Sequence, residues 1–280
     1  MPSRRGNYGF LRSFRCYYPS WGGILVLLLL LLAGALVGAA VQYAAGNYLG
    51  DYGNLVTYVL MFIPPMMWAA SRSGRSELLV DPCELDQASF LPPGAFAVVL
   101  TAVVATVAAG FVSDALTLLL PPMPVWLENA LKELTQGNLF ANFLCVCVAA
   151  PFFEEWLCRG MVLRGLLCNK VSPSLAIPVS ALFFALIHMN PWQAIPAFLI
   201  GCLMGWVYYR TGSLKLTMGM HFVNNGLALF ASRLPGMDSV SSWSEVMPSG
   251  VYAAVVALSV VLIAIAIALL RKCPAKMPGI

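Results

Sequence analysis

The chain alternates between long apolar stretches and short polar segments, a pattern that predicts membrane-spanning helices. A helix needs about 20 mainly apolar residues to cross a bilayer. A β-barrel would instead show alternating strands of about ten residues. The predicted fold class is all-α, a polytopic helical membrane protein with about eight transmembrane helices. We expect these at Ile24–Ala44, Leu55–Ala70, Ala95–Val112, Leu139–Leu167, Ser174–Met189, Ala194–Tyr209, Leu214–Ala231 and Val251–Leu270.

The polar segments divide the chain into four parts. Residues 1–23 are an N-terminal tail, residues 24–138 hold three predicted spans with their loops, residues 139–232 hold a core of four, and residues 233–280 hold the last span and a tail. The first apolar run is longer than the roughly 7–15 residues of a signal-peptide core, so we expect an uncleaved anchor. Val125–Thr135 has the pattern of a short amphipathic helix, with Trp126 suited to the membrane interface.

Composition supports the membrane assignment. Of the 280 residues, 60% are hydrophobic and 10% are charged, whereas a soluble domain is about half apolar and about a quarter charged. The net charge of +4 is small; it suits an anionic lipid surface and does not indicate nucleic acid as a partner. The eight cysteines include no CxxC pair, and we interpret them as small apolar packing residues.

The distribution of Lys and Arg predicts the orientation in the membrane. With eight spans, 13 of the 16 Lys and Arg residues fall on one side, and the positive-inside rule places that side in the cytoplasm. Only Lys132 and Arg233 fall opposite, and Arg159 lies within a predicted span. We therefore expect both termini in the cytoplasm, and the style of the sequence favours a bacterial inner membrane.

Ionisable residues inside the predicted spans are the candidates for chemistry, because placing them at lipid depth is costly. Within Leu139–Ala231 the acidic residues are Glu154 and Glu155, and the two histidines of the chain, His188 and His221, lie in the same region. Four titratable groups thus gather on three apolar segments.

The two glutamates are followed by Arg159. Glu155 and Arg159 are four residues apart, so they share a helix face and can form an ion pair, which has a purely structural interpretation as well as a functional one. Glu154 is rotated from Glu155 by about 100° and has no obvious partner. A buried carboxylate without a partner favours its protonated form near neutral pH, which suits a general base.

Two further pairs share helix faces. Phe184 and His188 can pack ring against ring, and His221 and Asn225 can together donate hydrogen bonds to a developing oxyanion. Taken alone, each pair is also explained by packing, because polar side chains join helices in membranes.

Taken together, the three motifs resemble the CAAX-protease and bacteriocin-processing family, also called CPBP or Abi, of intramembrane endopeptidases. The resemblance covers about Leu139–Ser232, and it implies a helical-bundle protease that cuts peptide bonds within or next to the bilayer. The matching motifs are EExxxR (Glu154, Glu155 and Arg159), FxxxH (Phe184 and His188) and HxxxN (His221 and Asn225).

The resemblance implies catalytic roles for these residues. Glu154 would be the general base that activates water, and His188 would orient or polarise that water. Glu155 and Arg159 would form a supporting pair, with Glu155 also able to bind water or substrate.

The resemblance further implies that His221 and Asn225 hold the oxyanion of the tetrahedral intermediate. Glu154, His188 and His221 are also chemically suitable zinc ligands, although the chain has no HExxH motif. The cofactor is therefore left open as none or a divalent metal such as zinc, and we favour a glutamate-activated water without metal.

The expected function is hydrolysis of a peptide or membrane-protein substrate, prenylated or not, by an enzyme embedded in the lipid bilayer. The sequence does not indicate an oligomeric state. Two alternatives use the same residues. One is a non-catalytic bacteriocin-immunity or scaffold membrane protein. The other is a proton-coupled transporter whose buried Glu and His side chains relay protons.

Overall fold

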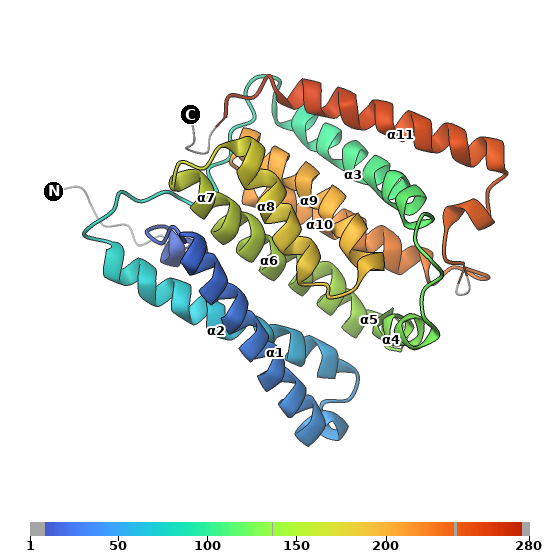
Figure 1. Cartoon of the computed structure of the whole chain (residues 1–280), viewed down its shortest axis with the longest axis horizontal. Coiled ribbons are helices and arrows are strands. Elements are labelled where there is room, and N and C mark those ends of the chain that lie inside the picture. The colour runs from blue at the N-terminus through green and yellow to red at the C-terminus, as the bar shows by residue number, and fades with distance from the viewer. Residues whose placement is uncertain (1–8, 136, 238–239, 276–280) are drawn as a thin grey trace.

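The computed structural model describes residues 9–135, 137–237 and 240–275, and every regular element in this part of the chain is a helix (Figure 1). The predicted all-α class is confirmed. Three single turns of 3-10 helix occupy Phe10–Phe14, Gly50–Tyr52 and Trp243–Glu245. The separate α-helices are α1 (Trp21–Leu49), α2 (Gly53–Ser76), α3 (Ala95–Thr117), α4 (Val125–Thr135), α8 (Pro173–Leu186), α9 (Pro191–Thr211), α10 (Leu214–Ala231) and α11 (Ser249–Leu270).

Residues 139–168 form one continuous helix whose width changes along its length. The α-helical turns α5 (Leu139–Asn142), α6 (Ala150–Glu155) and α7 (Arg164–Cys168) are joined by π-helical turns at Phe143–Ala149 and Trp156–Leu163. Wide turns of this kind are frequent at functional sites. Here they lie on both sides of the two adjacent glutamates at the end of α6. We call the whole of residues 139–168 the glutamate helix.

The glutamate helix lies at the centre of the bundle together with α8, α9 and α10 (Figure 1). On one side, α3 contacts α9, α10 and α11. On the other side, α1 and α2 form a hairpin that reaches the glutamate helix through α2. The start of α1 and the end of α11 lie at the same end of the bundle (Figure 1).

The hairpin of α1 and α2 is held by close backbone approach. A Cβ added to Gly34 would lie 2.4 Å from the carbonyl oxygen of Met61, and one added to Gly38 would lie 2.8 Å from Thr57. Gly34 and Gly38 form a GxxxG motif, which lets two helices in lipid pack with their backbones close together.

Arg164 binds the N-terminal segment to the glutamate helix near the end of that helix. Its side chain is fully buried. The guanidinium donates hydrogen bonds to the carbonyl oxygens of Phe14, Arg15, Tyr17 and Cys83, at 2.7 to 3.3 Å. One buried cation therefore joins two chain segments to the glutamate helix.

Four stretches are long and apolar enough to cross a membrane by length and composition: Trp21–Ser76, Ala95–Thr117, Leu139–Cys168 and Ser249–Leu270. The first of these contains both α1 and α2. The prediction of eight spans is therefore not confirmed. The helix α8 is short, and α10 carries a histidine and two asparagines that reduce its hydropathy.

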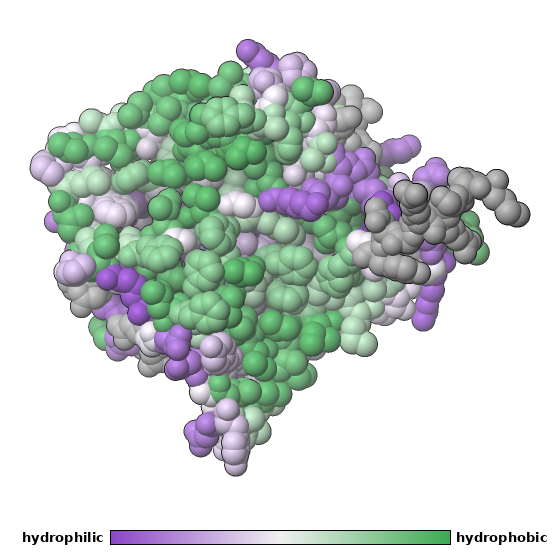
Figure 2. All heavy atoms as spheres, turned by 180° about the vertical axis from the view of Figure 1, so that it is seen from behind, coloured by the Kyte–Doolittle hydropathy of each residue, from purple (hydrophilic) through white to green (hydrophobic). Residues whose placement is uncertain are grey.

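The surface is that expected of an integral membrane protein. Figure 2 shows a broad hydrophobic face over the helices, with the hydrophilic residues gathered mainly towards the ends. Large apolar side chains such as Leu36 (74% exposed) and Phe96 (82% exposed) lie on the outside of the bundle. A surface of this kind is stable in contact with lipid and not with water.

Two predicted boundaries have different outcomes. The amphipathic helix at Val125–Thr135 is confirmed as α4, with Trp126 exposed. The predicted span Ser174–Met189 is too long, because α8 ends at Leu186 and His188 lies in the turn that follows. The cause is the start of α9, where Asn190 accepts a hydrogen bond from the Gln193 amide and Pro191 forces the preceding residue out of helical conformation.

Candidate active site

The predicted ion pair between Glu155 and Arg159 is confirmed. Both side chains are fully buried, and the Arg159 guanidinium donates to Glu155 Oε1 at 2.6 Å. The same guanidinium donates to the carbonyl oxygen of Gly201 at 2.9 Å and lies 4.9 Å from the ring centre of Phe184. The charge of Glu155 is thus compensated inside the bundle.

His221 on α10 lies between the two glutamates. Its Nδ1 is 3.1 Å from Glu155 Oε1, and its Nε2 is 3.6 Å from Glu154 Oε2. A carboxylate beside a guanidinium accepts hydrogen bonds and does not donate them, so we infer that Nδ1 of His221 carries a hydrogen. The other ring nitrogen, Nε2, therefore faces Glu154.

Glu154 has a second partner that the motifs did not predict. The hydroxyl of Tyr58 on α2 donates a hydrogen bond to Glu154 Oε1. The expectation that Glu154 lacks a partner is therefore wrong. The partner is 96 residues away in the sequence, and a tyrosine in an apolar span gives no signal of its own. Glu154 itself is 8% exposed.

An aromatic stack fixes the position of Tyr58. Its ring lies 5.3 Å from that of Phe62, and Phe62 stacks on Phe153 at 5.1 Å. Phe153 directly precedes Glu154. The stack therefore docks α2 onto the glutamate helix at the level of the two glutamates.

His188 is held by Phe184, as the FxxxH spacing predicts. Its Nδ1 lies 2.8 Å from the carbonyl oxygen of Phe184. A carbonyl oxygen only accepts hydrogen bonds, so Nδ1 carries a hydrogen, and Nε2 is the acceptor nitrogen whenever the ring is neutral. The rings of His188 and His221 both pack edge-on against Phe184, at 5.0 and 5.5 Å. Within the described residues, no hydrogen bond or ion pair joins His188 to Glu154.

Asn225 lies one helical turn after His221. Its amide donates to the carbonyl oxygen of Val146 at 2.9 Å, and its side-chain oxygen accepts from Asn224 at 3.1 Å. Asn225 thus links α10 to the first π-helical turn.

The structure brings four of the six predicted site residues into direct contact. Of the other two, His188 is connected to them through Phe184, and Asn225 is connected through α10. The four are Glu154, Glu155, Arg159 and His221.

Glu154, His188 and His221 carry donor atoms that suit a zinc ion. A zinc site needs at least three protein ligands converging on one point. In the described part of the chain, no group of three or more His, Cys, Asp or Glu side chains is placed to hold a metal ion. Glu154, His188 and His221 therefore do not fit a metal centre in this arrangement.

Comparison with known proteins finds a similarity to one family in the central segment. Residues 136–227 match the family model described as type II CAAX prenyl endopeptidase Rce1-like. The match covers about a third of the chain and includes all six predicted site residues, so the resemblance drawn from the three motifs is confirmed there. Searches of the curated proteins and of the solved structures found no match.

Proposed function

Starting from the match to Rce1-like CAAX prenyl endopeptidases, we propose that this chain is an intramembrane endopeptidase in which Glu154 activates a water molecule. The observation that carries the proposal is the setting of Glu154. Its carboxylate is held between the Tyr58 hydroxyl and the His221 imidazole, next to a compensated pair of Glu155 and Arg159. A general base needs this combination of fixed position and restricted hydration.

The proposed reaction uses the side chains in sequence. Glu154 accepts a proton from water, and the resulting hydroxide attacks the carbonyl carbon of the scissile amide. The His188 Nε2 lone pair accepts a hydrogen bond from the same water and orients it. The C–N bond then breaks, and Glu154 returns the proton to the leaving amine.

His221 and Asn225 stabilise the oxyanion in this proposal. Glu155 fixes the His221 ring through Nδ1. In this step of the proposal His221 acts as an imidazolium, with a hydrogen on each ring nitrogen, and its Nε2–H donates to the oxyanion. The Asn225 amide has a second hydrogen besides the one given to Val146. In other enzymes, loss of one such donor costs about 3–4 kcal/mol of transition-state stabilisation.

The substrate class in this proposal is a peptide or membrane protein that reaches the site from the bilayer. We further propose that eight helices, the short α8 included, cross the membrane, with both ends in the cytoplasm of a bacterial cell. The buried polar side chains of α10 belong to the site, which explains why this helix is less apolar than an ordinary span.

The test is a comparison of protein N-termini in membranes from cells that carry the wild-type chain or Glu154→Gln. This change keeps the size of the side chain and removes the base. Glu128→Gln is the matched control, because Glu128 lies on α4 in an exposed ion pair with Lys132. We expect a set of cleaved N-termini to disappear with Glu154→Gln and to persist with Glu128→Gln at equal protein level. Unchanged cleavage in both variants would overturn the proposal.

A further inference from the structure

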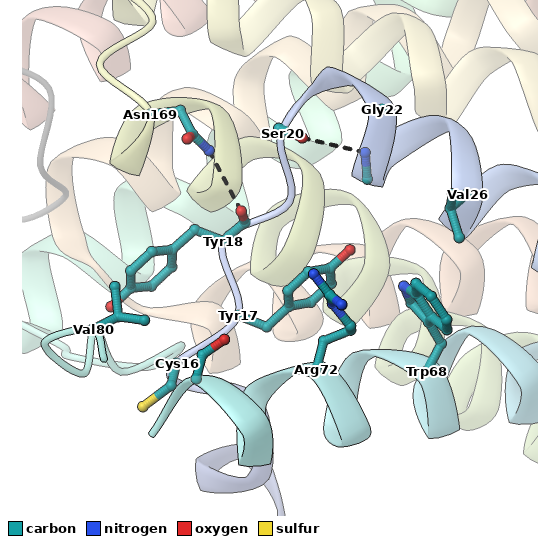
Figure 3. A pocket seen from close by; sticks show the side chains of 12 residues that line it. Cys16, Tyr17, Tyr18, Ser20, Gly22, Val26, Trp68, Arg72, Val80 and Asn169 are labelled. Carbon is teal, nitrogen blue, oxygen red and sulfur yellow. Dashed lines mark hydrogen bonds between the residues drawn. The ribbon is translucent and has the colours of Figure 1, made fainter. Parts of the chain in front are cut away.

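A pocket of about 420 Å³ lies where the N-terminal segment, the start of α1 and the end of α2 meet (Figure 3). Its size is within the range of small-ligand sites, about 300–1,000 Å³. We propose that this pocket binds the phosphate group of an anionic glycerophospholipid. The proposal concerns a site separate from Glu154 and does not depend on the proposed protease activity.

The pocket presents one cation whose charge is not compensated. Arg72 lines it from α2, with its guanidinium 5.6 Å from the ring centre of Trp68. No Asp or Glu lines the pocket, and within the described residues Arg72 has no ion pair. A guanidinium binds phosphate through two parallel N–H donors, which an exposed ion pair would otherwise occupy.

Tyr17 adds a hydroxyl donor on a side chain that is mostly buried. Its side chain lines the pocket and is 9% exposed, and within the described residues its hydroxyl has no hydrogen-bond partner. The hydroxyl points at the first turn of α1, since a Cβ added to Gly23 would lie 2.9 Å from it. Figure 3 shows Tyr17 and Arg72 reaching into the pocket from different segments. A hydroxyl that faces the pocket and has no partner within the described residues is available to donate a hydrogen bond to a phosphate oxygen there.

The surroundings favour a lipid as the source of the phosphate. Trp21, the first residue of α1, is 54% exposed, as expected of a tryptophan at the membrane interface. One and two turns further into α1, Leu25 and Leu29 are each 56% exposed, and Val26 lines the pocket itself. An acyl chain attached to a phosphate in the pocket would therefore continue along an apolar helix face.

The test uses the purified full-length protein in neutral detergent and follows its thermal denaturation. The ligands are short-chain phosphatidylglycerol, phosphatidylcholine of the same chain length, and glycerol 3-phosphate. The variants are Arg72→Gln and Gly22→Leu, which fills the pocket at a position where an added Cβ meets nothing within 4 Å. Arg75→Gln is the control, because Arg75 is exposed three residues further along α2 and does not line the pocket.

We expect phosphatidylglycerol to raise the melting temperature of the wild type and of Arg75→Gln. Arg72→Gln should bind about fivefold more weakly, the effect of one Arg near an anionic lipid, and Gly22→Leu should lose the response. An equal response to phosphatidylcholine, or an equal loss in Arg75→Gln, would overturn the site. Protection by glycerol 3-phosphate at the same concentration would overturn the lipid as its source and identify a soluble phosphate ester instead.

Discussion

Replacement of Tyr58 by Phe tests whether a helix outside the family match takes part in the proposed catalysis. The substitution removes one hydroxyl and keeps the ring that packs on Phe62. A hydrogen bond to a charged acceptor contributes about 1.5–3 kcal/mol. If that energy acts on the reacting state, kcat falls by about tenfold to about 150-fold. KM should stay within about twofold, because the lost bond goes to Glu154 and not to substrate.

The assay follows one cleaved N-terminus that depends on Glu154 in the membrane comparison. Its rate of formation is measured with purified variants over a range of substrate concentrations. Tyr43→Phe is the matched control, since Tyr43 lies on α1 and is 96% exposed. Phe62→Leu is the second control, because it weakens the aromatic stack and leaves the Tyr58 hydroxyl in place.

Cleavage by Tyr58→Phe within twofold of the wild type, with Glu154→Gln inactive, would contradict the proposed role of the Tyr58 hydroxyl. In that case the hydrogen bond is a packing feature and Glu154 is positioned by His221 alone. A loss of activity shared by Phe62→Leu and Tyr58→Phe would assign the effect to the docking of α2 and not to the hydroxyl.

Three further predictions concern buried charges and one thiol. Arg159→Met leaves Glu155 buried beside a single histidine, so the free energy of unfolding should fall by about 3–5 kcal/mol, and the double variant with Glu155→Gln should recover most of it in thermal denaturation. Arg164→Lys offers three donors where the guanidinium makes five hydrogen bonds, so its melting temperature should fall, and an unchanged value would contradict the role of Arg164 in binding the N-terminal segment. A hydrogen bond from Cys168 and the charge of Arg164 lower the pKa of the Cys83 thiol to about 6 against the effect of burial. Alkylation of Cys83 by iodoacetamide, followed by mass spectrometry, should therefore rise through pH 6 and level off above it, whereas Cys168→Ala should move the rise to higher pH.

Local spacing is what the sequence predicted well. Glu155 and Arg159 meet because residues four apart on a helix share a face, and this holds although a π-helical turn begins between them. Phe184 and His188 meet for the same reason, even though α8 ends before His188. Contacts set by a few consecutive residues survive small errors in helix boundaries.

Contacts between distant helices were not predicted. Hydropathy places Tyr58 in a span but does not say which neighbour its hydroxyl meets, because that depends on how the hairpin of α1 and α2 docks. The predicted number of spans is not confirmed by the criterion of length and apolarity for a related reason. Buried polar side chains make α10 less apolar than a lipid-facing helix, and their burial is decided by packing.

The family match and the candidate site therefore have different extents. The match extends from residue 136 to residue 227. The carboxylate of Glu154 is held from one side by α10, which lies largely within the match, and from the other side by α2, which lies outside it. The close backbone contact at Gly34 and the aromatic stack at Phe62 determine where α2 lies. It follows that residues 139–232 contain the chemistry of the proposed reaction but not all of the groups that position its base. Changes in the hairpin should consequently affect activity without touching any of the three motifs.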